Sequence, residues 1–361
     1  MTSRVRAAVA LLSLVACAGS GGPAPPGSMP TATAAPSAGA APIHLTAMPI
    51  PLPGASGNAS LDYLAYERGA RRVWVPVGST GSVDVMDTSG RAFTRVDGFG
   101  TAEREIRGAK RTIGPSAVSI GDGFAYVGDR GTSEVCAIDT KTLKLGKCLK
   151  LPMPIDGVVY VAPSKEVWVT APHDRLLVVL DAANPAQLAT KSTIQLDGEP
   201  EGYAVDDSRG LFFTNLEDKG GTVVIDVKTH KPQATWQAGC SDEGPRGVAV
   251  DTVRRFVLVA CTDRLQVLDA AHDGRVLGTL DTGAGVDNID YVEATMLVYV
   301  AAGKSERLSI ARLDDQGRLA LVATGTTSAG ARNPVADESG NVYVADSAAA
   351  RILFFDGRAV K

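Results

Sequence analysis

The sequence has few aromatic and histidine side chains, and its folded part lacks long apolar runs. Aromatic residues make up 5% of the 361 residues, and there are only 4 histidines. Beyond the N-terminal segment, no apolar run approaches the roughly 18 residues that a membrane-spanning helix needs. Basic residues form no block and the net charge is −4, so nothing in the composition supports a nucleic-acid partner.

Common catalytic and cofactor motifs are missing as well. The sequence contains no GxSxG elbow, CxxCH haem site, phosphate-binding loop or dinucleotide fingerprint, and no CxxC pair with zinc-site spacing. Nor does the region after the N-terminal segments show the 3.6-residue period of amphipathic helices. Together these absences favour an all-β protein and a binding protein over an enzyme. We expect no cofactor, although a divalent metal such as calcium or magnesium is retained below as an alternative.

Residues 1–17 have the features of a bacterial export signal. Arg4 and Arg6 precede the apolar run AAVALLSLVA, which is too short to anchor in a bilayer. The run ends in LVAC, which resembles the lipobox of bacterial lipoproteins and implies that the Cys17 thiol is acylated and the upstream peptide is removed. The alternative is an ordinary secretory signal in which Cys17 has no role.

Residues 18–43 consist almost wholly of Gly, Ala, Pro, Ser and Thr up to position 42, a composition typical of a flexible linker. We therefore expect residues 44–361 to form a folded body held at a membrane by its lipid alone. This arrangement predicts a location in the cell envelope, with the body in the periplasm or at the cell surface.

One short pattern recurs seven times in this body. A β-rich strand with a large apolar residue is followed by a polar turn and a second strand that ends in Asp, as in VYVADSAAARILFFD. The terminal acids, separated by 42 to 52 residues, are Asp87, Asp139, Asp181, Asp226, Asp269, Asp314 and Asp356. A repeat of this length with strand periodicity indicates the blades of a β-propeller. The long first interval contains GTAEREIRGAKR, for which we expect an exposed loop or a short helix.

Each repeat resolves into four antiparallel strands, a to d, except the last. The seventh repeat ends at Lys361 after strand c, and the stretch HLTAMPIPLP at 44–53 belongs to no other repeat. We predict a seven-bladed propeller whose last blade is closed by this N-terminal strand, which leaves only short edges. We read the strand-ending aspartates as turn caps, and the large apolar residues of strand b as packing between blades.

Phrases such as VYVA, VWVT and AYVG, each followed by a turn and a strand that ends in Asp, resemble the YVTN repeat of YncE-like seven-bladed propellers. The resemblance covers roughly residues 45–361 and implies an extracytoplasmic propeller. It implies little about chemistry, because this fold carries binding proteins, lactonases and scaffolds alike.

Four cysteines lie in the body, and an exported protein favours disulfides over free thiols. In the blade map Cys136 and Cys148 flank one hairpin, while Cys240 and Cys261 fall on the same face of the propeller. We predict the bridges Cys136–Cys148 and Cys240–Cys261, with free buried thiols as the alternative.

The candidate site is the channel mouth, where d–a and b–c loops emerge on one face. Alignment of the strand a starts gives one position per blade: Asp62, Ser116, Asp156, Glu201, Arg246, Asp287 and Arg332. Further polar residues from the same loops are His173, Glu199, Glu243, Asn288 and Asn333. The arginines suit a carboxylate or phosphate, and the acids suit a cation or hydroxyl groups.

Several interpretations of this mouth remain open. Its charges can simply pair and close the channel, or they can bind a polar small molecule, peptide, cell-wall component or partner protein. In a hydrolase or lactonase alternative, Asp156, Glu201, Asp287 and Asn288 would hold calcium or magnesium. A third alternative is a structural or adhesive surface module. We expect a monomer that binds an unknown polar ligand or envelope protein.

Overall fold

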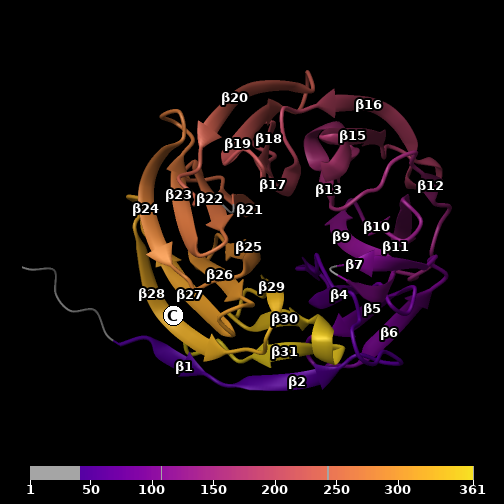
Figure 1. Ribbon diagram of the computed structural model, residues 1–361, viewed down its shortest axis with the longest axis horizontal. Helices are drawn as coiled ribbons and strands as arrows, with labels where there is room; N and C mark the ends of the chain where they lie inside the picture. Colours follow the sequence, from indigo (N-terminus) through magenta and orange to yellow (C-terminus); the bar gives the residue numbers. More distant parts are fainter. Residues whose placement is uncertain (1–40, 107, 242–243, 361) are drawn as a thin grey trace, which may run out of the picture. The chain divides into compact units, whose positions relative to one another are not determined.

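The inner strands of seven sheets contact one another in a closed ring (Figure 1). The computed structural model describes residues 41–106, 108–241 and 244–360. In this part of the chain, each of the seven main sheets runs outward from an inner strand through three antiparallel neighbours, and one sheet adds a fifth strand in parallel. The predicted seven-bladed propeller with four-stranded antiparallel blades is confirmed.

The first four blades follow the chain without rearrangement. Blades 1 and 2 consist of β3 (Ala65–Glu67), β4 (Arg72–Val77), β5 (Ser82–Asp87) and β6 (Phe93–Asp97), then β9 (Pro115–Gly121), β10 (Phe124–Asp129), β11 (Glu134–Asp139) and β12 (Leu149–Lys150). Blades 3 and 4 consist of β13 (Val158–Val161), β14 (Glu166–Ala171), β15 (Leu176–Asp181) and β16 (Ala189–Gln195), then β17 (Pro200–Asp206), β18 (Leu211–Leu216), β19 (Gly221–Asp226) and β20 (Lys231–Gln237).

The last three blades include both ends of the folded chain. Blades 5 and 6 consist of β21 (Pro245–Asp251), β22 (Phe256–Cys261), β23 (Arg264–Asp269) and β24 (Arg275–Asp281), then β25 (Val286–Val292), β26 (Leu297–Ala302), β27 (Arg307–Leu313) and β28 (Leu319–Thr326). Blade 7 consists of β29 (Arg332–Ala336), β30 (Val342–Asp346), β31 (Arg351–Phe355) and the N-terminal β2 (Ala47–Pro51).

The N-terminal segment closes the ring as predicted. Strand β2 pairs antiparallel with β31, so the chain's first strands lie beside its last (Figure 1). Strand β1 (Ile43–Leu45) also pairs, in parallel, with β28 and adds a fifth strand to blade 6, which the sequence analysis did not anticipate. The two strands therefore connect blades 6 and 7 from the outside.

The insertion after blade 1 is a hairpin. Strands β7 (Ala102–Ile106) and β8 (Ala109–Ile113) pair antiparallel as a separate sheet, so the expected loop or short helix was wrong. The described helical segments are four single 3-10 turns: η1 (Ala162–Ser164), η2 (Pro172–Asp174), η3 (Pro185–Gln187) and η4 (Ser347–Ala349). Among the described residues, no helix has the length and apolarity needed to cross a membrane.

The two structural interpretations of the repeat residues are confirmed. The large apolar residues of strand b are buried between blades: Trp74, Tyr126, Trp168, Phe212, Leu258, Tyr299 and Tyr343. Each strand-ending aspartate accepts a hydrogen bond from a backbone N–H two or three residues later, as Asp181 does from Ala183 at 2.9 Å. The aspartates are therefore turn caps in all seven repeats.

Both predicted disulfides are present. Cys136 and Cys148 have Cα atoms 4.1 Å apart, and those of Cys240 and Cys261 are 5.3 Å apart. The predicted export signal with Cys17 lies outside the described residues, as does most of the predicted linker. The first described strand begins at Ile43, next to the predicted start of the body at residue 44.

We expect the closing strand to contribute substantially to stability. Leu52 is 4% exposed and packs in the core of blades 1 and 7, whereas Met48 in β2 is 40% exposed. Leu52→Ala should lower the free energy of unfolding by roughly 2–4 kcal/mol, because it leaves a cavity among buried side chains. Met48→Ala, the matched control, should change it by less than about 0.5 kcal/mol. Equal values in denaturant titrations would contradict an anchoring role for this segment.

Candidate functional site

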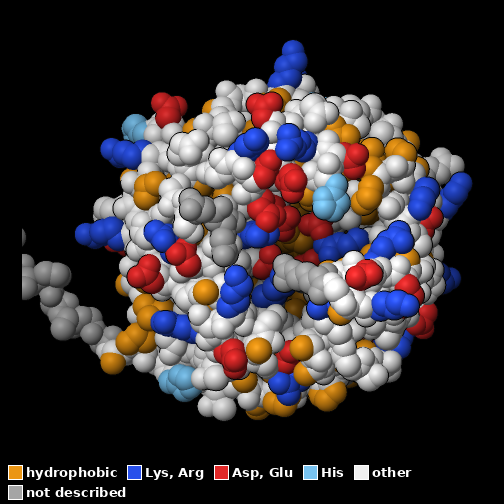
Figure 2. Space-filling model, viewed as in Figure 1, with side chains coloured by type: hydrophobic (Ala, Val, Ile, Leu, Met, Phe, Trp, Pro, Cys, Tyr) orange, Lys and Arg blue, Asp and Glu red, His pale blue; other side chains and the backbone are white. Residues whose placement is uncertain are grey.

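The inner strands bend at the channel mouth because five of them carry β-bulges. In each of these strands the pairing register shifts at the end that faces the mouth. The bulged residues are Ser116, Gly202, Arg246 with Gly247, Asp287 with Asn288, and Asn333. A bulge redirects the neighbouring side chains away from the regular pleat. Acidic and basic side chains accordingly gather around the hollow at the centre of the ring (Figure 2).

Tyr63 reaches across the channel from blade 1 to blade 4. Its backbone forms a parallel bridge with Ala117 of blade 2, in which the Tyr63 N–H donates to the Ser116 carbonyl at 2.9 Å and the Val118 N–H donates to the Tyr63 carbonyl at 3.1 Å. The phenol of Tyr63 donates a hydrogen bond to Oε1 of Glu201 at 3.0 Å, and its ring stacks on Tyr203 with centroids 5.5 Å apart. The Tyr203 ring in turn lies against Gly157, where any Cβ would come within 2.2 Å of it. The two tyrosines thus join blade 1 to blade 4 through their stacked rings.

Asp62 is the centre of one group of charges. Nη2 of Arg130 lies 2.8 Å from Oδ2 of Asp62 and also bonds to Asp156. The amide of Asn333 donates to Oδ1 of Asp62 at 2.7 Å. Although burial opposes it, the charge of Asp62 raises the pKa of Arg130 above its usual value. Blades 1, 2, 3 and 7 are joined at the mouth through these contacts.

Arg332 forms a second group with blade 6. Its Nε lies 3.2 Å from Oδ2 of Asp287, and its Nη2 lies 3.9 Å from Oδ1 of Asp62. The charge of Asp287 raises the pKa of Arg332 above its usual value, and Asp62 adds to this effect. The backbone N–H of Asn288 donates to the side-chain oxygen of Asn333 at 3.1 Å. The side chain of Arg332 nevertheless remains 40% exposed.

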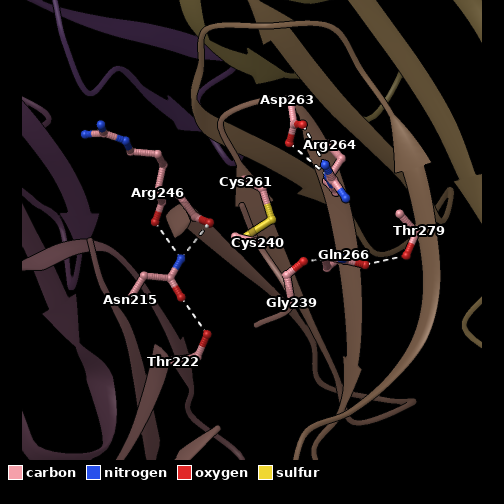
Figure 3. The surroundings of a disulfide bond; sticks show 11 residues. Asn215, Thr222, Gly239, Cys240, Arg246, Cys261, Asp263, Arg264, Gln266 and Thr279 are labelled. Atoms are coloured by element: carbon pink, nitrogen blue, oxygen red, sulfur yellow. Dashed lines mark hydrogen bonds and ion pairs between the residues drawn. A yellow bond between two sulfur atoms is a disulfide. The ribbon is translucent and has the colours of Figure 1, made fainter. Parts of the chain in front are cut away.

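Arg246 is held on blade 5 beside a disulfide (Figure 3). The Cys240–Cys261 bridge links the d–a loop just before β21 to the end of β22. The carbonyl of Arg246 accepts a hydrogen bond from the Asn215 amide at 2.6 Å, so its backbone is fixed from two sides. Its guanidinium lies 2.6 Å from Oε1 of Glu217, the residue after β18.

Glu201 is the acid whose ionisation is most disturbed at the mouth. Burial, followed by the negative charges of Asp287, Asp62 and Glu217, raises the pKa of Glu201 to about 8. The hydrogen bond from Tyr63 opposes this rise only in part. Burial also raises the pKa of Glu217, where the charge of Arg246 acts in the opposite direction. Strongly shifted carboxyl groups are frequent at functional sites.

A cavity of about 380 Å³ opens next to these groups. Its lining residues come from blades 5, 6 and 7 and are Arg246, Thr262, Gly285, Val286, Asp287, Gly303, Lys304, Ala329, Gly330 and Arg332. Three glycines form one wall of the cavity through their backbones. The N–H of Gly303 donates a hydrogen bond to the carbonyl of Gly285 at 3.0 Å, and the N–H of Gly330 donates to the carbonyl of Gly303 at 2.8 Å. The charged side chains of this cavity are three cations and one carboxylate.

Other predicted site residues are placed as follows. Ser116 is buried, and its hydroxyl points to the carbonyls of Gly128 and Asp156 at 3.4 and 3.5 Å. His173 is exposed in η2, and the backbone N–H of Glu199 donates to Asp218. Glu243 lies outside the described residues.

The residues considered for a metal have other partners. Asp156 bonds to Arg130, Asp287 to Arg332, and Glu201 to the phenol of Tyr63. Within residues 41–106, 108–241 and 244–360, no three His, Cys, Asp or Glu side chains are arranged to hold a metal ion.

Sequence reasoning missed several charged or aromatic residues of this mouth. Arg130, Glu217 and Lys304 follow the second strand of their blades, and all three stand at the mouth. Alignment of the strand b ends, in addition to the strand a starts, would have found them. The sequence carried no comparable signal for Tyr63, because its role depends on reaching a strand 138 residues away.

We expect Glu201 to make stability depend on pH. Because its pKa is raised in the folded protein, its contribution to stability decreases as pH rises from about 4.5, the usual glutamate range, to about 8. Glu201→Gln should match the wild-type melting temperature near pH 4.5 and exceed it increasingly up to pH 8. Glu306→Gln, at an exposed turn, is the control for loss of a carboxylate. A pH-independent difference between wild type and Glu201→Gln would contradict the assignment.

Comparisons with known proteins support the fold. The sequence matches no protein-family model and no curated protein. Among solved structures, streptogramin B lyase is similar with a TM-score of 0.67 and 11% identity, covering 87% of this chain and 98% of that one. Virginiamycin B lyase from Staphylococcus aureus has a TM-score of 0.66 and 11% identity, covering 86% of this chain and 99% of that one. A chain of the mitotic checkpoint complex has a TM-score of 0.66 and 13% identity, covering 91% of this chain and 98% of that one. At these identities the likeness concerns the fold alone.

Proposed function

We propose that this propeller is a binding protein that holds a small polar ligand at its channel mouth through an anionic group of the ligand. The observation that carries the proposal is the cavity lined by Arg246, Lys304 and Arg332. Three cations from separate blades converge there on a space of about 380 Å³, a size that suits a small molecule. Their convergence would be unfavourable without nearby acids or a bound anion.

The two arginines keep binding capacity despite their ion pairs. A guanidinium has five N–H donors in a planar fork, and each carboxylate contact uses only part of it. Arg332 contacts Asp287 through Nε, and Arg246 contacts Glu217 through Nη1. Each carboxylate fixes its arginine in position, so less side-chain entropy is lost when a ligand binds.

Ligand-induced stabilisation tests this proposal. Citrate, inorganic phosphate and a set of amino acids, all of which carry an anionic group, are added in thermal-shift and calorimetric assays. We expect at least one to bind, and Arg246→Lys or Arg332→Lys to weaken it about tenfold because lysine lacks the planar fork. Arg318→Lys, at an exposed turn in which Arg318 pairs with Asp314, is the matched control.

Three outcomes would count against this function. Binding that is equally strong in both mouth variants would move the site elsewhere on the molecule. No binding by any probe would leave the mouth as a network of structural ion pairs. Chemical conversion of a bound probe would favour the hydrolase alternative over a binding protein.

We also propose that the protein is a lipid-anchored member of the YncE-like propellers in the bacterial cell envelope. The LVAC motif at Cys17, the linker composition of residues 18–42 and the YVTN-like repeats support this. The two disulfides are in keeping with an oxidising compartment outside the cytoplasm. The anchor would hold the propeller at the membrane while leaving its mouth accessible to soluble ligands.

Mass spectrometry of the native amino terminus tests the anchor. We expect cleavage before Cys17 and a mass increase that corresponds to acyl chains on this residue. Cys17→Ala should release the protein from the membrane fraction while leaving its melting temperature unchanged. An unmodified Cys17, or cleavage at another position, would contradict the anchor.

A further inference from the structure

Cations and carboxylates alternate around the mouth, and side chains of both kinds line the cavity. The cations of the cavity come from β21, from the turn between β26 and β27, and from β29 of blades 5 to 7. Asp287 lines the same cavity from β25, with its Oδ2 3.2 Å from Nε of Arg332. A molecule in the cavity therefore meets cationic and anionic side chains at the same time.

Glu201 is not among the residues that line the cavity, but it interacts with the cavity-lining Asp287. Its hydrogen bond comes from the Tyr63 phenol at 3.0 Å, which is a neutral donor and leaves the charge of the carboxylate unbalanced. The titratable and charged groups that face Glu201 are Asp62, Tyr63, Arg130, Tyr203, Glu217, Asp287 and Arg332. Its two cationic neighbours are bonded to other carboxylates, since Arg130 binds Asp62 and Arg332 binds Asp287.

The raised pKa of Glu201 indicates an excess of negative charge around this carboxyl group. Burial is the main cause, and Asp287 is the charged neighbour with the largest effect. A cation beside these two carboxylates would favour the ionised form of Glu201 and relieve their mutual repulsion. A ligand that carries only negative charge would instead increase this repulsion.

The cavity wall leaves recognition to charged side chains. Gly285, Gly303 and Gly330 present backbone without side chains, and the N–H groups of Gly303 and Gly330 are already bonded within the wall. A Cβ at Gly285 would come within 2.5 Å of the Lys304 backbone nitrogen, so a larger residue at this position would displace its neighbour. The cavity of about 380 Å³ therefore suits a small ligand that its charged side chains recognise.

We propose that the mouth binds a small zwitterion of the α-amino-acid type, with its carboxylate on Arg246 and Arg332 and its ammonium group beside Asp287, where its charge also acts on Glu201. This inference rests on the proposed function and names the chemical class of its ligand. An α-amino acid fits because its carboxylate and ammonium group are only a few bonds apart. They can therefore pair at the same time with the arginines and with the neighbouring Asp287 of the cavity.

Calorimetry on the full chain tests the ligand class. A panel of L- and D-amino acids is titrated first, and the tightest binder is then compared with its N-acetyl derivative and its α-amide. The first derivative lacks the ammonium group and the second lacks the carboxylate. We expect each to bind at least tenfold more weakly, because each loses charge-assisted hydrogen bonds.

Glu201→Gln separates an effect of the Glu201 charge on the ligand from a structural role. The amide keeps an acceptor for Tyr63 but removes the negative charge, so amino-acid binding should weaken about tenfold while that of the N-acetyl derivative stays within about twofold. Wild type should release a proton on binding near neutral pH, measured in two buffers of different ionisation enthalpy, and the variant should not. Glu306→Gln is again the matched control, and melting temperatures confirm that each variant is folded.

The outcomes distinguish this inference from the function on which it rests. If citrate or phosphate binds at the arginines and no amino acid does, the ligand class is wrong and the anion-binding mouth stands. If neither class binds, both proposals fail. An amino acid whose N-acetyl derivative binds equally well would overturn the placement of the ammonium group beside Asp287 and its effect on Glu201.

Discussion

Closure of the ring is the constraint on which the mouth depends. Strand β2 completes blade 7, and the inner strands β3 and β29 then come into contact although they lie at opposite ends of the folded chain. Only this contact allows Asn333 to donate to Asp62, a bond between residues 271 positions apart. The hydrogen bond of Tyr63 to Glu201 likewise needs blades 1 and 4 on opposite sides of one channel. An open arrangement of the same blades would leave each of these polar groups without its partner.

Seven similar blades do not by themselves place functional side chains at one end of the channel. The β-bulges of the inner strands do so, and the residues that they bring to the mouth differ between blades. In a regular strand, successive side chains point alternately to the two faces of the sheet. The bulges instead turn the residues at the end of each strand towards the mouth, where their identity differs from blade to blade. Most of the resulting charges neutralise one another: Asp62 and Asp156 share Arg130, and Asp287 pairs with Arg332. Buried ion pairs often add little net stability, because desolvation offsets their attraction. Their clearer effect here is to hold the guanidinium groups in fixed orientations around the cavity.

The sequence predicted the features that recur and missed those that occur once. The blade count, the capping aspartates and the buried strand b residues repeat seven times, so the period alone revealed them. Both disulfides followed from the blade map, because each links positions that neighbouring strands bring together. The β7–β8 hairpin was not recognised because AEREI and AKRTI are largely polar on both faces, as expected for a ribbon that packs little against a core. The parallel pairing of β1 was missed for a related reason, since three residues beside a linker carry almost no pattern.

The fold does not determine the ligand, because the fold depends on residues that recur in every blade and the mouth depends on residues that occur once. Two lyases and a chain of the mitotic checkpoint complex have similar folds at 11 to 13% identity, so the shared fold leaves the side chains of the mouth undetermined. What is particular to this chain is the order of charges around the ring: carboxylates from blades 1, 3, 4 and 6, and arginines from blades 2, 5 and 7. Arg130 is surrounded by acids and is neutralised within the network, whereas Arg246 and Arg332 stand on either side of the cavity-lining Asp287. The mouth therefore presents both signs of charge next to each other rather than one sign throughout. A ligand that carries both charges can pair with both kinds of group, whereas a ligand with a single charge can pair with only one kind.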